Sequence, residues 1–194
     1  MPSMKILLIA GGWSSEREVS LTGARGMQEA LLKRGHAVTF FDLLENFDEL
    51  LETARQHDFA LINLHGSPGE DGLVQAMLEK AGCPYQGSGP SGSFLALNKA
   101  AAKQIFRMAG LPTADWEFLP VRPAEGWEPR LPWPLFVKTT TGGSSLRLGR
   151  ATNRQELDAL MDEIFAAGEG VLIEPQRPGK EITCGILGEE AMPP

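Results

Sequence analysis

The fold of the N-terminal half is decided by the stretch KILLIAGG, residues 5–12. Five consecutive apolar residues followed by two glycines are typical of a strand that is buried on both faces of a parallel sheet and ends in a loop. A helical pattern comes next, with Met27, Leu31 and Leu32 at the spacing of helical turns, and it ends near Gly35. The sequence therefore predicts a strand, a loop and a helix in succession.

The same alternation repeats after this helix. HAVTFFD at 36–42 and FALINL at 59–64 predict two more strands, and residues 43–56 between them predict a helix. Strands separated by helices of this length favour a parallel sheet with right-handed crossovers. We therefore expect residues 1–93 to form a three-layer α/β domain that binds ligands at the carboxyl ends of its strands.

The pattern changes beyond the Gly-rich stretch at 87–92. Residues 94–194 favour a smaller α+β domain, because short strands are mixed there with helices and a proline-rich connection. Its expected elements are a helix at 95–109, a connection at 119–134, a strand at 135–138, a helix capped by Thr152 and Gln155, and strands at 170–174 and 182–187.

Composition excludes several classes of protein. Of the 194 residues, 42% are hydrophobic and 22% are charged, which is typical of a globular protein and not of a disordered one. A net charge of −7 without a basic cluster argues against nucleic acid as a partner, and the lack of a long apolar run argues against a membrane span. Two cysteines are too few for a disulfide framework and the N-terminus lacks a signal-peptide pattern, so we expect a cytoplasmic protein.

The loop TTTGGSS at 139–145 is the most informative candidate for a phosphate site. Its two glycines let backbone N–H groups approach an anion, and its hydroxyls add hydrogen-bond donors. Lys138, at the end of the preceding strand, would add a positive charge. A polar turn without a ligand is the alternative, since Gly, Ser and Thr are common in turns.

Two glutamates bracket a turn further along the chain. Glu174 and Glu181 stand at either end of PQRPGK, residues 175–180, which has the composition of a turn. Carboxylates beside a phosphate loop could accept hydrogen bonds from ribose hydroxyls or from an adenine amino group. Glutamates at strand ends are also commonly solvated without any ligand, and the residues themselves leave both interpretations open.

Two polar loops, GGWSSERE at 11–18 and HGSPGEDG at 65–72, follow the first and third predicted strands. Because the carboxyl ends of parallel strands lie at one edge of a sheet, we expect the loops to meet there. The side chains that would come near one another are Glu16, His65, Glu70 and Asp71. A carboxylate beside a histidine could orient a small polar substrate or tune a proton, although ordinary helix-start and loop residues would look the same.

Taken together, these loops resemble the D-alanine–D-alanine ligase family of the ATP-grasp superfamily over essentially the whole chain. Six motifs stand in the order that the family shows. They are GGWSSEREVSL at 11–21, HGSPGEDG at 65–72, PYQGS at 84–88, NKAAAK at 98–103, the Lys138 loop with Ser144 and Ser145, and VLIE at 171–174 leading to Glu181. Each motif alone is weak, but the six together in this order are specific.

The resemblance implies an N-terminal pre-ATP-grasp, Rossmann-like domain followed by an ATP-grasp subdomain. It implies an ATP-dependent ligase that joins two D-alanines through an acyl phosphate, for peptidoglycan and cell-wall synthesis. By the same resemblance, Glu16 would hold the ammonium of the first D-alanine, with His65 nearby in the substrate site. Lys99 and Lys138 would contact the ATP phosphates, and Gly143, Ser144 and Ser145 would belong to the loop that closes over the phosphates and substrate. Glu174 would contact the adenine and Glu181 the ribose. Among these residues, Glu16 and Ser144 are the expected catalytic residues.

The resemblance also implies partners and cofactors. We expect ATP, Mg²⁺ (or Mn²⁺), D-alanine as substrate, and a homodimer. In the family, two acids and an asparagine hold the magnesium and an arginine stabilises the oxyanion, all in a C-terminal ATP-grasp part. We expect that part to be absent from these residues, and the 194 residues to be inactive alone.

Some residues depart from the family pattern. The departures are Asn98 in place of an acid, Thr139 in place of a proline, Gly142 in place of a glutamate, Leu146-Arg147 in place of Val-Gly, and Pro175 in place of a lysine. They keep a second interpretation open, a non-catalytic relative that binds a nucleotide or a partner protein. A third interpretation is another carboxylate–amine ligase with a different acceptor. The motifs around Glu16 and His65 argue against it. The acceptor, whether D-alanine, D-lactate or D-serine, also stays open.

Overall fold

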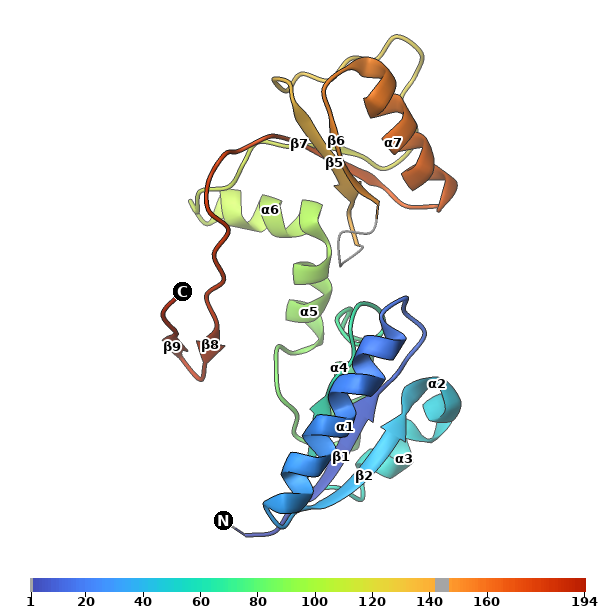
Figure 1. Ribbon diagram of the computed structural model, residues 1–194, viewed down its shortest axis with the longest axis vertical. Helices are drawn as coiled ribbons and strands as arrows, with labels where there is room; N and C mark the ends of the chain where they lie inside the picture. The colour runs from blue at the N-terminus through green and yellow to red at the C-terminus, as the bar shows by residue number, and fades with distance from the viewer. Residues whose placement is uncertain (1, 142–146) are drawn as a thin grey trace. The chain divides into compact units, whose positions relative to one another are not determined.

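A computed structural model describes residues 2–141 and 147–194 (Figure 1). Within it the chain forms two compact units. The first unit comprises residues 1–113 and 139–146, and the second comprises residues 114–138 and 147–194. The helices at 90–108 thus belong to the first unit. The domain boundary near residue 93 stays a prediction.

The sheet of the first unit is parallel, as the sequence predicts. Its strands are β1 (Lys5–Ala10), β2 (Ala37–Asp42) and β3 (Phe59–Ile62), in the order β2-β1-β3. Both neighbours of β1 run parallel to it, and a parallel bridge between Ala60 and Tyr85 extends the pairing beyond β3. The helices of this unit are α1 (Arg17–Lys33), α2 (Leu43–Asn46), the 3₁₀ turn η1 (Phe47–Glu49), α3 (Leu50–Ala54), α4 (Leu73–Ala81), α5 (Pro90–Leu97) and α6 (Lys99–Met108).

Alternate side chains of β1 enter two separate cores. Leu7 and Ile9 pack with apolar residues of α3 and α4, whereas Leu8 and Ala10 pack with α1 on the other face of the sheet. Figure 1 shows α1 lying along β1 and β2. A strand that is covered on both faces needs apolar residues at every position, which explains the uninterrupted run in the sequence. The predicted three-layer arrangement is confirmed.

Two predicted helices of the first unit are interrupted. Residues 43–56 form α2, η1 and α3 in place of one helix. The helix predicted at 95–109 is likewise wrong, because Asn98 separates α5 from α6 with an extended ψ of 97°. The Asn98 side chain accepts a hydrogen bond from the Ala101 N–H at 3.1 Å, so it caps α6. Asparagine is a preferred N-cap residue, and here that preference overrides the continuous apolar pattern.

The second unit contains a four-stranded sheet in the order β4-β7-β5-β6 and one long helix. Its elements are β4 (Glu117–Leu119), β5 (Leu135–Thr139), β6 (Leu148–Ala151), α7 (Arg154–Ala166), β7 (Val171–Pro175), β8 (Ile186–Leu187) and β9 (Glu190–Ala191). The inner strands β5 and β7 pack their apolar side chains against α7, and this packing forms the core of the unit. The small α+β arrangement that the sequence predicts is present here.

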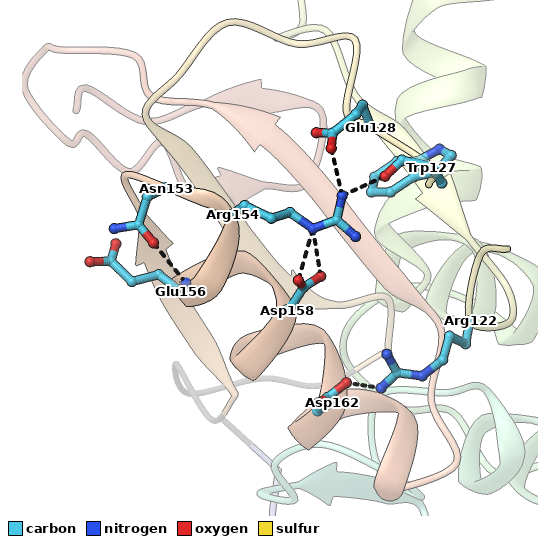
Figure 2. Close-up of polar contacts among 8 residues, drawn as sticks. All are labelled: Arg122, Trp127, Glu128, Asn153, Arg154, Glu156, Asp158 and Asp162. Carbon is cyan, nitrogen blue, oxygen red and sulfur yellow. Dashed lines mark hydrogen bonds and ion pairs between the residues drawn. The ribbon is translucent and has the colours of Figure 1, made fainter. Parts of the chain in front are cut away.

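The proline-rich connection before β5 is tied to α7 by two arginines (Figure 2). Arg154 donates hydrogen bonds to the Trp127 carbonyl at 2.6 Å, to Glu128 at 2.9 Å and to both carboxylate oxygens of Asp158 at 2.8 Å. Trp127 also packs against the core of this unit. The connection therefore contributes to packing as well as linking two strands.

The second arginine acts one turn further along α7. Arg122 forms an ion pair with Asp162 (Figure 2). Its guanidinium also lies 5.6 Å from the centre of the Phe165 ring. A cation over an aromatic face is attracted by the ring quadrupole. Both arginines thus hold the connection against the same helix.

The cap of α7 lies one residue later than predicted. Asn153, not Thr152, accepts the hydrogen bond from the backbone, at 3.0 Å from the Glu156 N–H. The Glu156 carboxylate in turn accepts hydrogen bonds from the backbone N–H and the hydroxyl of Thr152. These bonds lower the pKa of the Glu156 carboxyl, the backbone bond most of all. Gln155 has no part in the cap, so the predicted Thr152–Gln155 pair is wrong.

The last nineteen described residues, 176–194, are all exposed. The strand predicted at 182–187 is confirmed only at its last two residues, which form β8 and pair with β9 in a separate hairpin. Within the described ranges, the helices lack the combination of length and hydropathy that is needed to cross a bilayer.

Candidate functional site

The loop after β1 holds Glu16 at the start of α1. Gly11 has a φ of +77°, a conformation that favours glycine, and a Cβ there would lie 2.5 Å from both Arg17 Nη1 and Asp42 Oδ1. Arg17 binds both carboxylate oxygens of Asp42, at 2.7 and 2.6 Å, and also donates to the Gly12 carbonyl at 3.3 Å. The loop is therefore fixed to the ends of β1 and β2 immediately beside Glu16.

The Arg17–Asp42 pair lowers the pKa of the Asp42 carboxyl. The hydrogen bonds and positive charge of Arg17, together with the Leu44 N–H, hold the pKa of the Asp42 carboxyl below its usual value. Asp42 also caps α2 through the same Leu44 N–H, at 3.1 Å. The Asp42 carboxylate thus stabilises both the loop after β1 and the start of α2.

The loops after β1 and β3 meet, as the sequence predicts. A Cβ on Gly66 would lie 3.5 Å from the Ser14 Cβ and 3.8 Å from a carboxylate oxygen of Glu16. His65, the residue before Gly66, is half-buried, and Glu16 is half-buried as well. The structure thus brings the Glu16 carboxylate against the loop that carries His65.

Beside these loops the first unit has a cavity of about 500 Å³. Leu64 and Glu70 line it from the loop after β3, Gln75 from α4, and Lys99 from the start of α6. Lys99 is also tied to the candidate phosphate loop, because its backbone N–H donates to the Thr140 carbonyl at 2.9 Å. Three predicted site residues, Glu16, His65 and Lys99, therefore belong to one compact unit.

The candidate phosphate loop is described only in part. Thr139 and Thr140 are buried, with 2% and 5% of their surface exposed, so these two hydroxyls are not presented as surface donors. The interpretation of the whole loop as a phosphate cradle stays a prediction. Gly143, Ser144 and Ser145 lie outside the described residues, together with Gly142 and Leu146.

Lys138 and Glu174 form an ion pair on the neighbouring strands β5 and β7 of the second unit. Both side chains are mostly buried, with 27% and 13% of the side-chain surface exposed. The two residues predicted to contact phosphate and adenine thus contact each other. A nucleotide bound through them would have to compete with this pair or share it.

Arg147 and Glu181 also lie in the second unit. Arg147 has a φ of +52° and forms an ion pair with Glu169 at 3.7 Å. A left-handed conformation suits the glycine that the resembling family carries at this position. Glu181 lies in the exposed segment 176–194, outside any strand.

A metal site is not offered by the described residues. Within 2–141 and 147–194, His, Cys, Asp and Glu side chains do not gather in groups of three or more that could hold an ion. Mg²⁺ prefers carboxylate oxygens in octahedral geometry, and the described side chains do not supply such a set.

Sequence reasoning missed the groups that hold the loops in place. Ser20 and Asn63 are buried and join the ends of β1 and β3, and the Arg17–Asp42 pair joins β1 to β2. Ser20 stands inside the motif GGWSSEREVSL. Its sequence neighbours do not mark it as inward-facing, because successive residues of a helix point in different directions and Val19 is 63% exposed. The partners of Ser20 therefore have no signal in the local sequence.

The chain is similar to D-alanine–D-alanine ligases in sequence. The family model described as the C-terminus of D-Ala–D-Ala ligase matches residues 104–193. The D-alanine–D-alanine ligase of Desulfovibrio desulfuricans is 74% identical over 98% of this chain, and that of Nitratidesulfovibrio vulgaris is 62% identical over the same share. The chain spans 62% and 63% of the length of these two curated relatives.

The fold is similar to ligases of the same name. A crystal structure of the Bacillus anthracis D-alanine–D-alanine ligase matches 98% of this chain at 36% identity, with a TM-score of 0.87, and the match covers 63% of that structure. A second Bacillus anthracis structure, complexed with ATP, gives a TM-score of 0.88 at 35% identity and is covered to 65%. The predicted resemblance to the D-alanine–D-alanine ligase family is confirmed.

Proposed function

We propose that the chain supplies the D-alanine site and part of the ATP site of a D-alanine–D-alanine ligase. The observation that carries the proposal is the convergence of the loops after β1 and β3, which sets the Glu16 carboxylate beside the loop of His65. A carboxylate in this place suits the ammonium group of an amino acid. The similarity to ligases over 98% of the chain supports the same conclusion.

The proposed reaction has two steps. A carboxylate oxygen of the first D-alanine attacks the γ-phosphorus of ATP, which forms an acyl phosphate and releases ADP. The neutral amine of the second D-alanine then attacks the carbonyl carbon, and phosphate leaves with its bonding electrons as the peptide bond forms. The proton that the amine nitrogen loses ends on the released phosphate. Glu16, with His65 nearby, would fix the first D-alanine by its ammonium group, so that its carboxylate is oriented for the first step.

The nucleotide side of the proposal rests on two lysines. Lys99 begins α6, and Lys138 is the last residue but one of β5, where it pairs with Glu174. Phosphoryl transfer depends on positioning and on neutralising charge, and lysine ammonium groups supply that charge. We propose that Lys138 exchanges Glu174 for a phosphate when ATP binds, and that Glu174 then serves the adenine. The proposed roles of Gly143, Ser144 and Ser145 in covering the phosphates, with Ser144 as a catalytic residue, and of Glu181 at the ribose rest on the resemblance.

Mg²⁺ (or Mn²⁺) is the metal expected to accompany ATP. The described residues do not fit a site for it. The residues of this chain are proposed only to bind and orient substrate and nucleotide. This mismatch also underlies our proposal that the 194 residues do not form the dipeptide alone.

The test compares two proteins. One is the 194-residue chain, and the other is the same chain followed by the portion of the Desulfovibrio desulfuricans ligase that it does not cover. With D-alanine and Mg-ATP, we expect the longer protein to form D-alanyl-D-alanine and the chain alone to form none. If D-alanine carries ¹⁸O in its carboxylate, the acyl-phosphate route predicts ¹⁸O in the released phosphate. Dipeptide from the chain alone, or phosphate without ¹⁸O, would contradict the corresponding part of the proposal.

A second candidate is a relative that binds a nucleotide or a partner protein without catalysis. The observation that favours it is the Lys138–Glu174 ion pair, which neutralises the Lys138 charge that would otherwise attract a phosphate. Thermal shift with ATP, ADP and D-alanine, measured on the longer protein, separates the two, since a ligand that binds only the folded state raises its stability. Stabilisation by nucleotide without dipeptide formation would favour this second candidate.

We also propose a homodimer, as expected from the resemblance, and a cytoplasmic location, as expected from the sequence. Light scattering coupled to size-exclusion chromatography tests the oligomeric state. A dimer of the 194-residue chain would have twice its mass of 21.0 kDa, and a mass of 21.0 kDa would show a monomer.

A further inference from the structure

The ends of β1 and β3 are joined by a serine and an asparagine. Ser20 Oγ accepts a hydrogen bond from the Gly11 N–H at 2.8 Å and donates one to the Asn63 carbonyl. The Asn63 side-chain amide donates back to the Ser20 carbonyl at 2.6 Å. Gly11 opens the loop of Glu16, and Asn63 stands two residues before His65. We call these three bonds the Ser20–Asn63 clamp.

The Ser20 hydroxyl makes both of these bonds through a single oxygen. The Gly11 amide requires an acceptor and the Asn63 carbonyl requires a donor, and one serine oxygen supplies both. Ser20 is 0% exposed and Asn63 is 8% exposed, so water cannot easily replace the missing partner. Removing the hydroxyl would leave a buried N–H and a buried carbonyl unsatisfied at the two loop origins.

The clamp is also connected to the residues of the proposed D-alanine site. The Ser20 N–H donates to the Glu16 carbonyl at 3.0 Å, within the first turn of α1. The Asn63 N–H donates to the Ile9 carbonyl at 2.8 Å, which fixes it to β1. A shift of α1 against β3 would therefore move Glu16 relative to the loop of His65.

We propose that the Ser20–Asn63 clamp sets the spacing between Glu16 and His65, and that Ser20 and Asn63 are positioning residues for the first D-alanine. This inference rests on the proposed function, because it assigns the two loops to that substrate. Neither residue touches the substrate in this scheme. Their effect passes through the Glu16 carboxylate and the His65 ring.

The first part of the test needs no activity. Amide hydrogen exchange, followed by NMR, is measured on the 194-residue chain and on its Ser20→Ala, Ser20→Thr and Ser3→Ala variants. Ser3→Ala is the matched control, because it removes one hydroxyl bond, to the Gly35 carbonyl at 2.7 Å, from another part of the same unit. We expect Ser20→Ala to speed exchange at Gly11 by about tenfold, which corresponds to the loss of one buried hydrogen bond.

The expected pattern is local. The Ile9 amide in β1 should change much less than the Gly11 amide, Ser3→Ala should change neither, and Ser20→Thr should restore protection at Gly11 because it keeps a hydroxyl. Equal acceleration at Ile9 and Gly11 would mean general destabilisation, and unchanged exchange at Gly11 would mean that the bond is unimportant. Either result overturns the inference.

The second part separates the inference from the proposed function. In the longer protein described above, Ser20→Ala should raise the KM for D-alanine about 3- to 10-fold while the KM for ATP changes less than about twofold. If the unmodified longer protein forms dipeptide and Ser20→Ala leaves the KM for D-alanine unchanged, the clamp does not position the substrate and the function stands. If the unmodified protein is inactive, the proposed function fails, and with it the assignment of the clamp to D-alanine.

Discussion

The loops at the carboxyl end of the first sheet and the segment at 176–194 differ in how they are held. The loop that opens with Gly11 is fixed by Ser20 inside the unit and by the Arg17–Asp42 pair. Every residue of the segment 176–194 is exposed, and among the described residues its strands β8 and β9 pair with each other alone. The residues proposed to contact D-alanine are thus held in place by buried hydrogen bonds and an ion pair before any ligand binds. Glu181, in contrast, lies in a segment that is exposed along its whole length.

This difference bears on which contacts are ready for a ligand. A side chain held by buried hydrogen bonds loses little freedom when a substrate binds, so more of the interaction remains as affinity. An exposed segment has to be ordered first. We therefore expect substitutions around Gly11 to affect stability strongly and substitutions in 176–194 to affect it little.

The largest effect is expected for Gly11→Ala. A Cβ would meet Arg17 and Asp42 at 2.5 Å, and a φ of +77° disfavours any other residue. The free energy of unfolding of the first unit should fall by about 3 kcal/mol, from steric overlap and backbone strain together. Urea denaturation followed by circular dichroism measures the change.

Gly26→Ala is the matched control for this substitution. Gly26 lies within α1, its φ is in the ordinary range, and a Cβ there would meet no atom within 4 Å. Replacing glycine by alanine in a helix should raise the free energy of unfolding by about 0.5–1 kcal/mol. If both variants changed stability equally, the tight packing of the loop at Gly11 would be disproved.

Asp42→Asn should have the next largest effect, and the effect should depend on pH. Because Arg17 lowers the pKa of Asp42 in the folded chain, the ionised carboxylate stabilises the fold above its unfolded pKa, and this stability is lost as pH falls through the folded pKa. Near pH 7 the free energy of unfolding should fall by about 1 kcal/mol, since a mostly shielded pair retains part of its strength.

The measurement for Asp42→Asn is a series of urea titrations at decreasing pH. The difference from the unmodified chain should begin to shrink below about pH 4, where the unfolded carboxyl becomes protonated. A difference that stays constant from neutral to acid pH would show that the charge of Asp42 does not contribute.

Arg147→Gly probes backbone strain in the second unit. Arg147 has a φ of +52°, which costs a residue with a side chain more than it costs glycine, and its ion pair with Glu169 is long and partly exposed. The free energy of unfolding should rise by about 0.5 kcal/mol, the strain relief being partly offset by the greater freedom of glycine when unfolded. Arg147→Ala is the control, because it removes the same ion pair without freeing the backbone. If Arg147→Gly lowered the free energy of unfolding as much as Arg147→Ala does, the backbone at Arg147 would not be strained.

The smallest effect is expected for Arg177→Ala. Arg177 pairs with Asp115 at 3.3 Å, but the two side chains are 61% and 79% exposed. Ion pairs in such places contribute little, so the free energy of unfolding should change by less than about 0.5 kcal/mol. A larger loss in urea denaturation would show that the start of the segment 176–194 is held more firmly than its exposure indicates.

Much of the first unit is predictable because its pattern is local. The run ILLIA gives a doubly covered strand, and the rule for the carboxyl ends of parallel strands brings the two loops together. The break at Asn98 escaped this reasoning, because the apolar pattern continues through it and only the capping preference of asparagine marks the end of α5. The local sequence pattern predicts structure least well where a single side chain determines where a helix ends.

Other features depend on residues that are distant in sequence. The burial of Thr139 and Thr140, the pairing of Lys138 with Glu174, and the partners of Ser20 arise from tertiary packing, which periodicity does not encode. The strand predicted at 182–187 has suitable apolar residues, yet only Ile186 and Leu187 pair within the described residues. Sequence motifs therefore locate the candidate site better than they describe its contacts.

The most direct test of the account is the effect of Glu16→Gln on substrate use by the longer protein, with Glu18→Gln as control. Glu18 is two residues away in the first turn of α1 and is exposed, so it has the same charge and local setting without the proposed role. The account predicts that Glu16→Gln raises the KM for D-alanine by about 10- to 100-fold, the loss of one charged hydrogen bond, while the KM for ATP changes less than about twofold. Equal effects of the two substitutions, or equal losses in D-alanine and ATP use, would contradict it.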